Sequence, residues 1–141
     1  MPLAPQEVRT FFITAITANR RPIFKVESNA QLLISIFQEN QSKGRIELYA
    51  WVIMPDHIHL LLMPAPEVSL EKAMQFVKGT FSFRLKSKLP IWQPGFTWHR
   101  IEDVRDFKSH REYIHQNPVR VRLCSKAEEY PYSSAKQSIV G

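Results

Sequence analysis

The sequence predicts an α+β fold in which helices pack on an antiparallel β-sheet. Along the chain, short apolar runs typical of strands alternate with segments whose apolar residues recur three or four positions apart, as in helices. The chain has 141 residues, of which 44% are hydrophobic and 23% charged, as in an average globular protein. This length supports one core, so we expect a single domain over residues 1–141.

The first half of the chain predicts a strand, a helix and a hairpin. The strand covers residues 11–17, which are mostly β-branched and aromatic. Helical spacing of apolar residues predicts a helix over 28–42, and Gly44 stands where helix ends favour glycine. Residues 45–54 and 58–63 are two strand-like runs with a Pro-Asp turn between them, so we expect an antiparallel hairpin.

The segment after the hairpin predicts a second helix. Ser69 can cap its start, and an apolar stripe continues toward Lys88. Gly79 lies inside this helix, where glycine costs ~1 kcal/mol relative to alanine. We therefore expect another group to approach the backbone closely there.

The last two elements complete the predicted order. A short strand is expected over 97–101 and a third helix over 104–116, ended by Pro118, which would move Asn117 out of helical angles. Strand, helix, strand, strand, helix, strand is the split βαβ arrangement called ferredoxin-like, with helices on one face of the sheet. The third helix is an addition at its C-terminal end. Such a fold does not by itself define a function.

The charge is uneven along the chain. Its 19 basic and 13 acidic residues leave a net charge of +6, and a pI near 9.7 favours a polyanionic partner. Residues 1–70 hold six side chains of each sign, whereas residues 71–141 hold thirteen basic and seven acidic ones. The basic excess therefore lies in the second half.

A single cysteine, Cys124, excludes an intrachain disulfide and a zinc site built from cysteines. The apolar run Tyr49–Met54 is far shorter than the ~20 residues that cross a bilayer. We therefore expect a cytoplasmic protein that is neither exported nor embedded in a membrane.

Two histidines beside the Pro-Asp turn form a candidate metal site. His57 and His59 are two apart on a predicted strand, so they share one face, while Ile58 and Leu60 face the core. Imidazole is the commonest neutral protein ligand for divalent metals, and two such neighbours can chelate one ion. The alternative is a pair of surface histidines next to a turn.

A tyrosine and an asparagine on the third helix form a second candidate. Tyr113 and Asn117 are four apart and therefore neighbours on one helix face. A phenol can serve as a covalent nucleophile, and an amide oxygen suits magnesium or manganese. The alternative is that Tyr113 is a packing residue and that Asn117 only ends the helix.

The stretch from residue 72 to residue 100 contains six basic residues and no acidic one, with six aromatic residues interleaved. Basic side chains for phosphates and aromatic rings for bases are typical of single-stranded nucleic-acid binding. The alternative is a solvated helix with buried aromatics. With two arginines of the first half added, the candidate DNA-binding residues are Lys72, Lys78, Arg84, Lys86, Trp92, Phe96, Trp98, Arg100, Arg20 and Arg21.

Five segments, in this order, carry a resemblance to a known family. They are Met54–Leu62, Ser69–Gly79, Trp92–Phe96, Tyr113–Val119 and Tyr130–Ala135. Together they resemble the REP-associated tyrosine transposases, which belong to the HUH single-tyrosine group of small bacterial insertion sequences. The likeness extends over nearly the whole chain.

The resemblance implies a function for the candidate residues. His57 and His59 match the paired histidines that bind a divalent metal, and Asn117 matches the position of a third ligand. Tyr113 matches the tyrosine that attacks a DNA phosphodiester and becomes joined to the 5′ phosphate. The implied substrate is single-stranded DNA with palindromic REP hairpins, the implied cofactor is magnesium or manganese, and the protein would act as a monomer or a homodimer.

Three further histidines are not part of this resemblance. His115 follows Tyr113 by two positions on a helix and should point elsewhere. We expect His99, His110 and His115 to be structural or to contact phosphate.

Two other functions remain open from the sequence. A non-catalytic RNA- or DNA-binding module can share the fold, although it would not need two histidines and a tyrosine together. A nickase of the replication-initiator or relaxase type would share those residues, but the short chain without a helicase segment favours a transposase.

Overall fold

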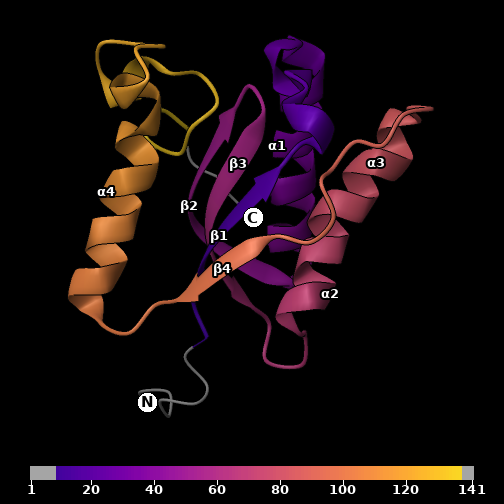
Figure 1. Cartoon of the computed structure of the whole chain (residues 1–141). Helices are drawn as coiled ribbons and strands as arrows, with labels where there is room; N and C mark the ends of the chain where they lie inside the picture. The colour runs from indigo at the N-terminus through magenta and orange to yellow at the C-terminus, as the bar shows by residue number, and fades with distance from the viewer. Residues whose placement is uncertain (1–8, 138–141) are drawn as a thin grey trace.

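Four antiparallel strands form a sheet with helices on both faces (Figure 1). The computed structural model describes residues 9–137, and within them the strand order is β2-β3-β1-β4, the predicted ferredoxin-like order. The strands are β1 (Phe11–Ile16), β2 (Ile46–Met54), β3 (His57–Pro64) and β4 (Thr97–Arg100). The helical elements are η2 (Ala18–Arg20), η3 (Ile23–Lys25), α1 (Glu27–Ser42), α2 (Leu70–Met74), the π-helical turn η4 (Gln75–Gly79), α3 (Thr80–Leu85), α4 (Val104–Arg120) and η5 (Ala127–Glu129).

The two faces of the sheet have different partners. Figure 1 shows α1, α2 and α3 on one side and α4 on the other. In β1 and β3, Ile13 pairs with Leu60, and both side chains are buried in the cluster under α1 and α2. The next pair, Thr14 and His59, faces the α4 side because successive strand residues alternate between faces.

The main core lies between the sheet and the helices α1 to α3. Its largest fully buried side chains include Phe24, Phe37, Trp51 and Phe81, and each contributes roughly 1.5 to 3 kcal/mol by burial. A smaller cluster lies under α4. It consists of Ala50, Val52, Met54, Leu61, Ile114 and Tyr130.

The second helix is less regular than its apolar stripe predicts. Ser69 caps it as expected by accepting a hydrogen bond from the backbone N–H of Lys72 at 3.0 Å. The π-helical turn η4 then separates α2 from α3. A Cβ on Gly79 would meet only the side chain of Gln75 at 3.5 Å, so the expected close approach at this glycine is wrong. Gly79 instead ends the π-helical turn.

The tyrosine-bearing helix α4 is longer than predicted. It continues through Pro118 to Arg120, so Asn117 keeps its place in the helix. The prediction that Pro118 ends the helix is wrong: the proline lies in the last turn, where its missing N–H removes one helical hydrogen bond shortly before the helix ends at Arg120. The backbone N–H of Val121 still reaches the Asn117 carbonyl at 3.3 Å, which closes the helix end.

In the described part of the chain, none of the helices has the length and apolar character needed to span a membrane.

Candidate active site

His57 and His59 lie side by side on β3, on the face toward α4. Their ring centroids are 4.9 Å apart with an interplanar angle of 77°. His59 is 6% exposed, whereas His57 is only partly buried at the edge of the turn. The predicted pairing of the two imidazoles on one face is therefore present.

Each imidazole is oriented through its Nδ1 atom. The Nδ1 of His57 donates to the carboxylate of Asp56 at 2.7 Å, and the Nδ1 of His59 lies 2.8 Å from the hydroxyl of Thr14. Asp56 is held in turn by the guanidinium of Arg20 at 3.2 Å. Nε2 of each ring remains for a metal ion, and such outer hydrogen bonds fix the rings of metal-binding histidines.

Burial sets the protonation of His59, and hydrogen bonds set that of Asp56. It lowers the pKa of His59 to about 3, with smaller contributions from the neighbouring His57 and Arg120. Burial acts to raise the pKa of Asp56, but hydrogen bonds from His57 and Arg20 outweigh it and hold that pKa below its usual value. At neutral pH His59 is therefore an uncharged imidazole, while Asp56 is a carboxylate.

Tyr113 on α4 lies against the same histidine. Its ring centroid is 5.4 Å from that of His59 and 5.8 Å from that of Phe12, whose ring stacks on His59 at 5.4 Å. The guanidinium carbon of Arg120 lies 4.2 Å from the centre of the Tyr113 ring. Tyr113 remains 41% exposed, so a substrate can reach this side chain.

Asn117 lies one turn after Tyr113 on α4 and is 7% exposed. Within residues 9–137 its Oδ1 atom is buried and has no hydrogen-bond partner. A buried acceptor without a partner costs about 1 to 3 kcal/mol, and a bound cation would remove this cost by accepting the lone pair of the oxygen. Two imidazoles and one amide oxygen are donors that a divalent ion accepts, and the residues fit such an ion.

The other tyrosines are placed differently. The hydroxyl of Tyr130 donates to the Ile53 carbonyl at 2.7 Å, and burial raises its pKa far above the usual range. The hydroxyl of Tyr49 reaches only the sulfur of Met63 at 3.9 Å, and the ring of Tyr132 packs on Tyr130. Of the tyrosines in the described chain, Tyr113 is the one beside the paired histidines.

The three remaining histidines have other partners. The Nε2 of His115 lies 2.8 Å from the hydroxyl of Ser134, so this ring points away from Tyr113 as expected. His99 and His110 both contact the carboxylate of Asp106.

Several of the predicted DNA-binding residues lie on the other face of the sheet. Trp98 pairs with Ile13, so its side chain is on the side of α2 and α3, opposite His59. The ammonium group of Lys78 donates to the Gly95 carbonyl at 2.6 Å, and burial lowers its pKa. The structure does not bring these side chains to the histidine pair.

Most of the remaining residues of this set lie around α1, α3 and the following loop, whereas Arg100 is on β4 and Arg20 binds Asp56 beside His57. The indole N–H of Trp92 donates to the Lys78 carbonyl at 3.1 Å, and its ring packs with Phe24 and Phe81 in the core. Phe96 also packs against that core. Arg84 forms an ion pair with Glu39 at 2.8 Å, and the ammonium of Lys72 lies 5.5 Å from the centre of the Phe76 ring. Lys86 follows α3 in a left-handed backbone conformation, and Arg100 is the strand partner of Phe11. Arg20 forms an ion pair with Asp56, and Arg21 donates to the Pro90 carbonyl. Their role in DNA binding stays a prediction.

Phe12, Thr14 and Asp56 belong to the site although their sequence positions do not indicate it. The strand register explains the first two, since Thr14 pairs with His59 and Phe12 faces the same side. Alternation along β1 is enough to place Phe12 and Thr14 on one face of the strand. The sequence of β1 does not, however, indicate that Thr14 pairs with His59 of β3. Asp56 is predicted only as a turn residue, and in the structure it also orients His57.

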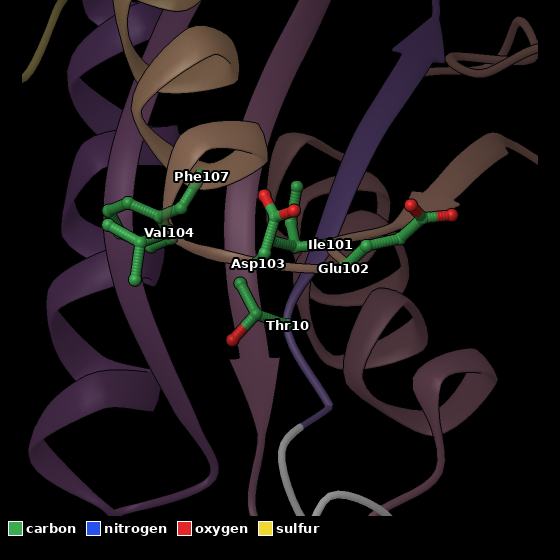
Figure 2. A pocket seen from close by; sticks show the side chains of 6 residues that line it. All are labelled: Thr10, Ile101, Glu102, Asp103, Val104 and Phe107. Atoms are coloured by element: carbon green, nitrogen blue, oxygen red, sulfur yellow. The ribbon is translucent and has the colours of Figure 1, made fainter.

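One pocket lies beside the candidate active site, and another lies apart from it. One beside the tyrosine is lined by Phe12, Ser109, His110 and Tyr113. Another, at the connection between β4 and α4, contains none of the predicted site residues (Figure 2). It is lined by Thr10, Ile101, Glu102, Asp103, Val104 and Phe107.

Known proteins resemble this chain in sequence and structure. The family model described as "Transposase IS200 like" matches residues 9–117. A REP-associated tyrosine transposase of Escherichia coli K12 is 27% identical over 131 residues, which are 92% of this chain and 78% of the relative. A Haemophilus influenzae protein described as a "putative REP-associated tyrosine transposase" is 30% identical over 119 residues, covering 74% of this chain and 68% of that protein.

Solved structures agree in fold. The REP-associated tyrosine transposase bound to a REP hairpin has a TM-score of 0.80 and 24% identity, covering 100% of this chain and 87% of that one. A transposase-like protein from Deinococcus radiodurans has a TM-score of 0.58 and 21% identity, covering 81% of this chain and 95% of that one. The matched family implies a divalent metal. The chain therefore belongs to the IS200-like transposases, a family of enzymes.

Proposed function

We propose that this protein is a metal-dependent endonuclease and strand transferase that acts on single-stranded DNA at or near REP-type hairpins. The observation that carries the proposal is the position of Tyr113, whose ring lies 5.4 Å from that of His59, with the unpartnered oxygen of Asn117 one turn further along α4. A nucleophile, two imidazoles and an amide oxygen are thus presented from two packed elements.

Tyr113 would provide the nucleophile. Its phenolic oxygen forms a bond to the DNA phosphorus and loses its proton, while the bond from phosphorus to the 3′ oxygen breaks and leaves a 3′ hydroxyl. Attack by a 3′ hydroxyl on the phosphotyrosine reverses these steps and rejoins a strand. The covalent bond conserves the energy of the phosphodiester, so the cycle needs no nucleotide.

His57, His59 and Asn117 would hold the divalent ion, for which magnesium or manganese is our proposal. When bound, such an ion neutralises charge that develops on the phosphate and orients the scissile bond. Asp56 and Thr14 keep the two rings in place through their Nδ1 atoms. Arg120, stacked on the Tyr113 ring, adds positive charge beside the nucleophile.

The relatives support the choice of substrate. A similar protein has been solved bound to a REP hairpin, and the net charge of +6 suits a polyanion of this kind. We propose that the basic and aromatic residues between Lys72 and Arg100 bind flanking DNA. Chromosomal DNA as the substrate would require the protein to act in the cytoplasm.

The test is formation of a covalent adduct. The full chain is incubated with end-labelled hairpin DNA and Mg²⁺ or Mn²⁺, and the products are separated by denaturing electrophoresis. We expect a protein-bound labelled strand and a free 3′ hydroxyl, neither of which forms with Tyr113→Phe. Tight hairpin binding without any adduct in the parent protein would instead favour the alternative, a non-catalytic nucleic-acid-binding module.

A further inference from the structure

A second group of metal-ligating side chains lies where β4 meets α4, outside the proposed active site. His99 is on β4, and Asp106 and His110 are four residues apart on α4. One ligand atom from each residue lies within 4.8 Å of the others; Asp106 and His110 are partly buried, and the side chain of His99 is exposed. We propose that His99, Asp106 and His110 bind one zinc ion that fastens the tyrosine-bearing helix to the edge strand.

The distances inside this cluster are close to those of a zinc site. The Nε2 of His99 lies 2.8 Å from one oxygen of the Asp106 carboxylate, and the Nδ1 of His110 lies 3.0 Å from the other. The two imidazole rings stack at 4.8 Å with an interplanar angle of 23°. Ligands bound to tetrahedral zinc at ~2.0 to 2.1 Å lie roughly 3.3 Å from one another. The Nδ1 of His110 also lies 2.9 Å from the Asp106 backbone carbonyl, so a bound ion would replace that hydrogen bond and displace the proton that makes it.

The backbone holds these three groups before any ion binds. Asp106 is in the first turn of α4, whose start is capped by Asp103, and the Glu102 N–H donates to the Asp106 carboxylate at 2.9 Å. His99 is fixed by strand pairing with Phe12.

The donor set favours zinc over the ion of the active site. Zinc accepts imidazole nitrogens and carboxylate oxygens, and three protein ligands leave a fourth position for water. Magnesium prefers oxygen ligands and bound water, so it suits this set less well.

The cluster is linked to the nucleophile by direct packing. His110 precedes Tyr113 by three residues, and its ring lies 4.7 Å from the Phe12 ring. Phe12 stacks on His59 and meets Tyr113 edge-on. An ion that joins His99 to His110 would therefore limit movement of α4 relative to the sheet and hold Tyr113 at the paired histidines.

The test measures zinc binding without the active-site ligands. A full-length variant carrying His57→Ala and His59→Ala is dialysed against Zn²⁺, and we expect saturation at about one ion per chain. Adding His110→Ala or Asp106→Asn should weaken zinc affinity by about tenfold or more. Removing a group that only orients a metal ligand already costs that much, and these two residues are proposed to bind the ion directly. Adding His115→Ala, which removes a histidine outside both clusters, should leave affinity unchanged. Circular dichroism checks that each variant is folded.

Cobalt provides an independent readout. The same double variant loaded with Co²⁺ should show the visible absorption of a tetrahedral site, and His110→Ala should abolish it. Absence of saturable zinc binding in the double variant, or equal affinities in the His110→Ala and His115→Ala backgrounds, would show that the three residues form only a hydrogen-bonded clamp. Because DNA cleavage is not measured, either result is independent of the proposed nuclease activity.

Discussion

Tyr113 on α4 and His59 on β3 face each other edge-on, with ring centroids 5.4 Å apart and an interplanar angle of 74°. They are far apart in the sequence, and the packing of α4 across β2 and β3 brings them together. This contact joins the proposed nucleophile to the proposed metal ligands. Substitution of Tyr113 should therefore affect covalent attachment to DNA, whereas substitution of the histidines should affect metal binding.

Tyr113→Phe should abolish the covalent DNA adduct and leave the fold intact, because it removes only a hydroxyl from a side chain that is 41% exposed. Denaturing electrophoresis measures the adduct, and the free energy of unfolding should change by less than ~0.5 kcal/mol. Tyr49→Phe is the matched control and should form the adduct normally. A normal adduct yield with Tyr113→Phe would place the nucleophile elsewhere.

His57→Ala or His59→Ala should each abolish cleavage, and a chelator should do the same to the parent protein. The physical reason is removal of an ion ligand, which isothermal titration with Mn²⁺ measures directly. His115→Ala removes an imidazole that lies against Ser134 instead and should cleave. Normal cleavage by His59→Ala in magnesium would contradict the metal-site assignment.

Asn117→Leu should separate stability from activity. The substitution removes a buried oxygen that has no partner within residues 9–137, so the free energy of unfolding without metal should stay equal or rise, by up to ~1 to 3 kcal/mol. Cleavage should disappear, since leucine cannot bind an ion. A large decrease in stability of the metal-free protein would mean that the amide has a structural role instead.

Metal-free protein should lose stability as the pH falls below about 6.5. The pKa of His59 is about 3 in the folded state and near 6.5 when unfolded, so the unfolded chain takes up a proton that the native state excludes. The contribution of His59 to the free energy of unfolding is therefore fully present above pH 6.5. Between pH 6.5 and pH 3 it declines, by at most ~1.4 kcal/mol per pH unit.

Urea unfolding in the presence of a chelator measures this dependence. His59→Gln removes the titrating ring and should flatten the curve between pH 6.5 and 5, a range above the titration of the carboxylates. His115, whose pKa burial also lowers, contributes in the same direction and remains in both proteins. Identical slopes for the parent and His59→Gln would assign the acid sensitivity to other groups.

Replacing Lys78, Arg84 and Lys86 together by Gln should weaken hairpin binding and reduce its salt dependence by up to ~0.7 to 0.9 log units for each phosphate that is no longer neutralised. At saturating DNA the variant should still form the Tyr113 adduct. The control replaces Lys25, Lys43 and Lys126, which removes the same charge elsewhere. Equal salt slopes for the two variants would show that the first set is a solvated face, and Arg20, Arg21, Arg120 and Arg122 would then become the candidates.

Local sequence patterns are enough to predict the order of strands and helices, the pairing of His57 and His59 on one strand face, and the spacing of Tyr113 and Asn117. They are enough because strand and helix periods fix which side chains share a face. The predicted end of α4 is wrong because a local signal is overridden. Pro118 is a strong stop signal, yet α4 continues through it to Arg120, so the signal marks the last turn of the helix and not its final residue.

Long-range packing sets which of these faces meet. The register of β1 against β3 places Thr14 beside His59, and the packing of α4 on the sheet places Tyr113 against the same ring. The contacts of His59 with Thr14 and with Tyr113 join segments that are distant in the sequence, and their pairing depends on long-range burial, which local periodicity does not encode. His99 and Asp106 lie close in the sequence, and the turn from β4 into α4 brings them together.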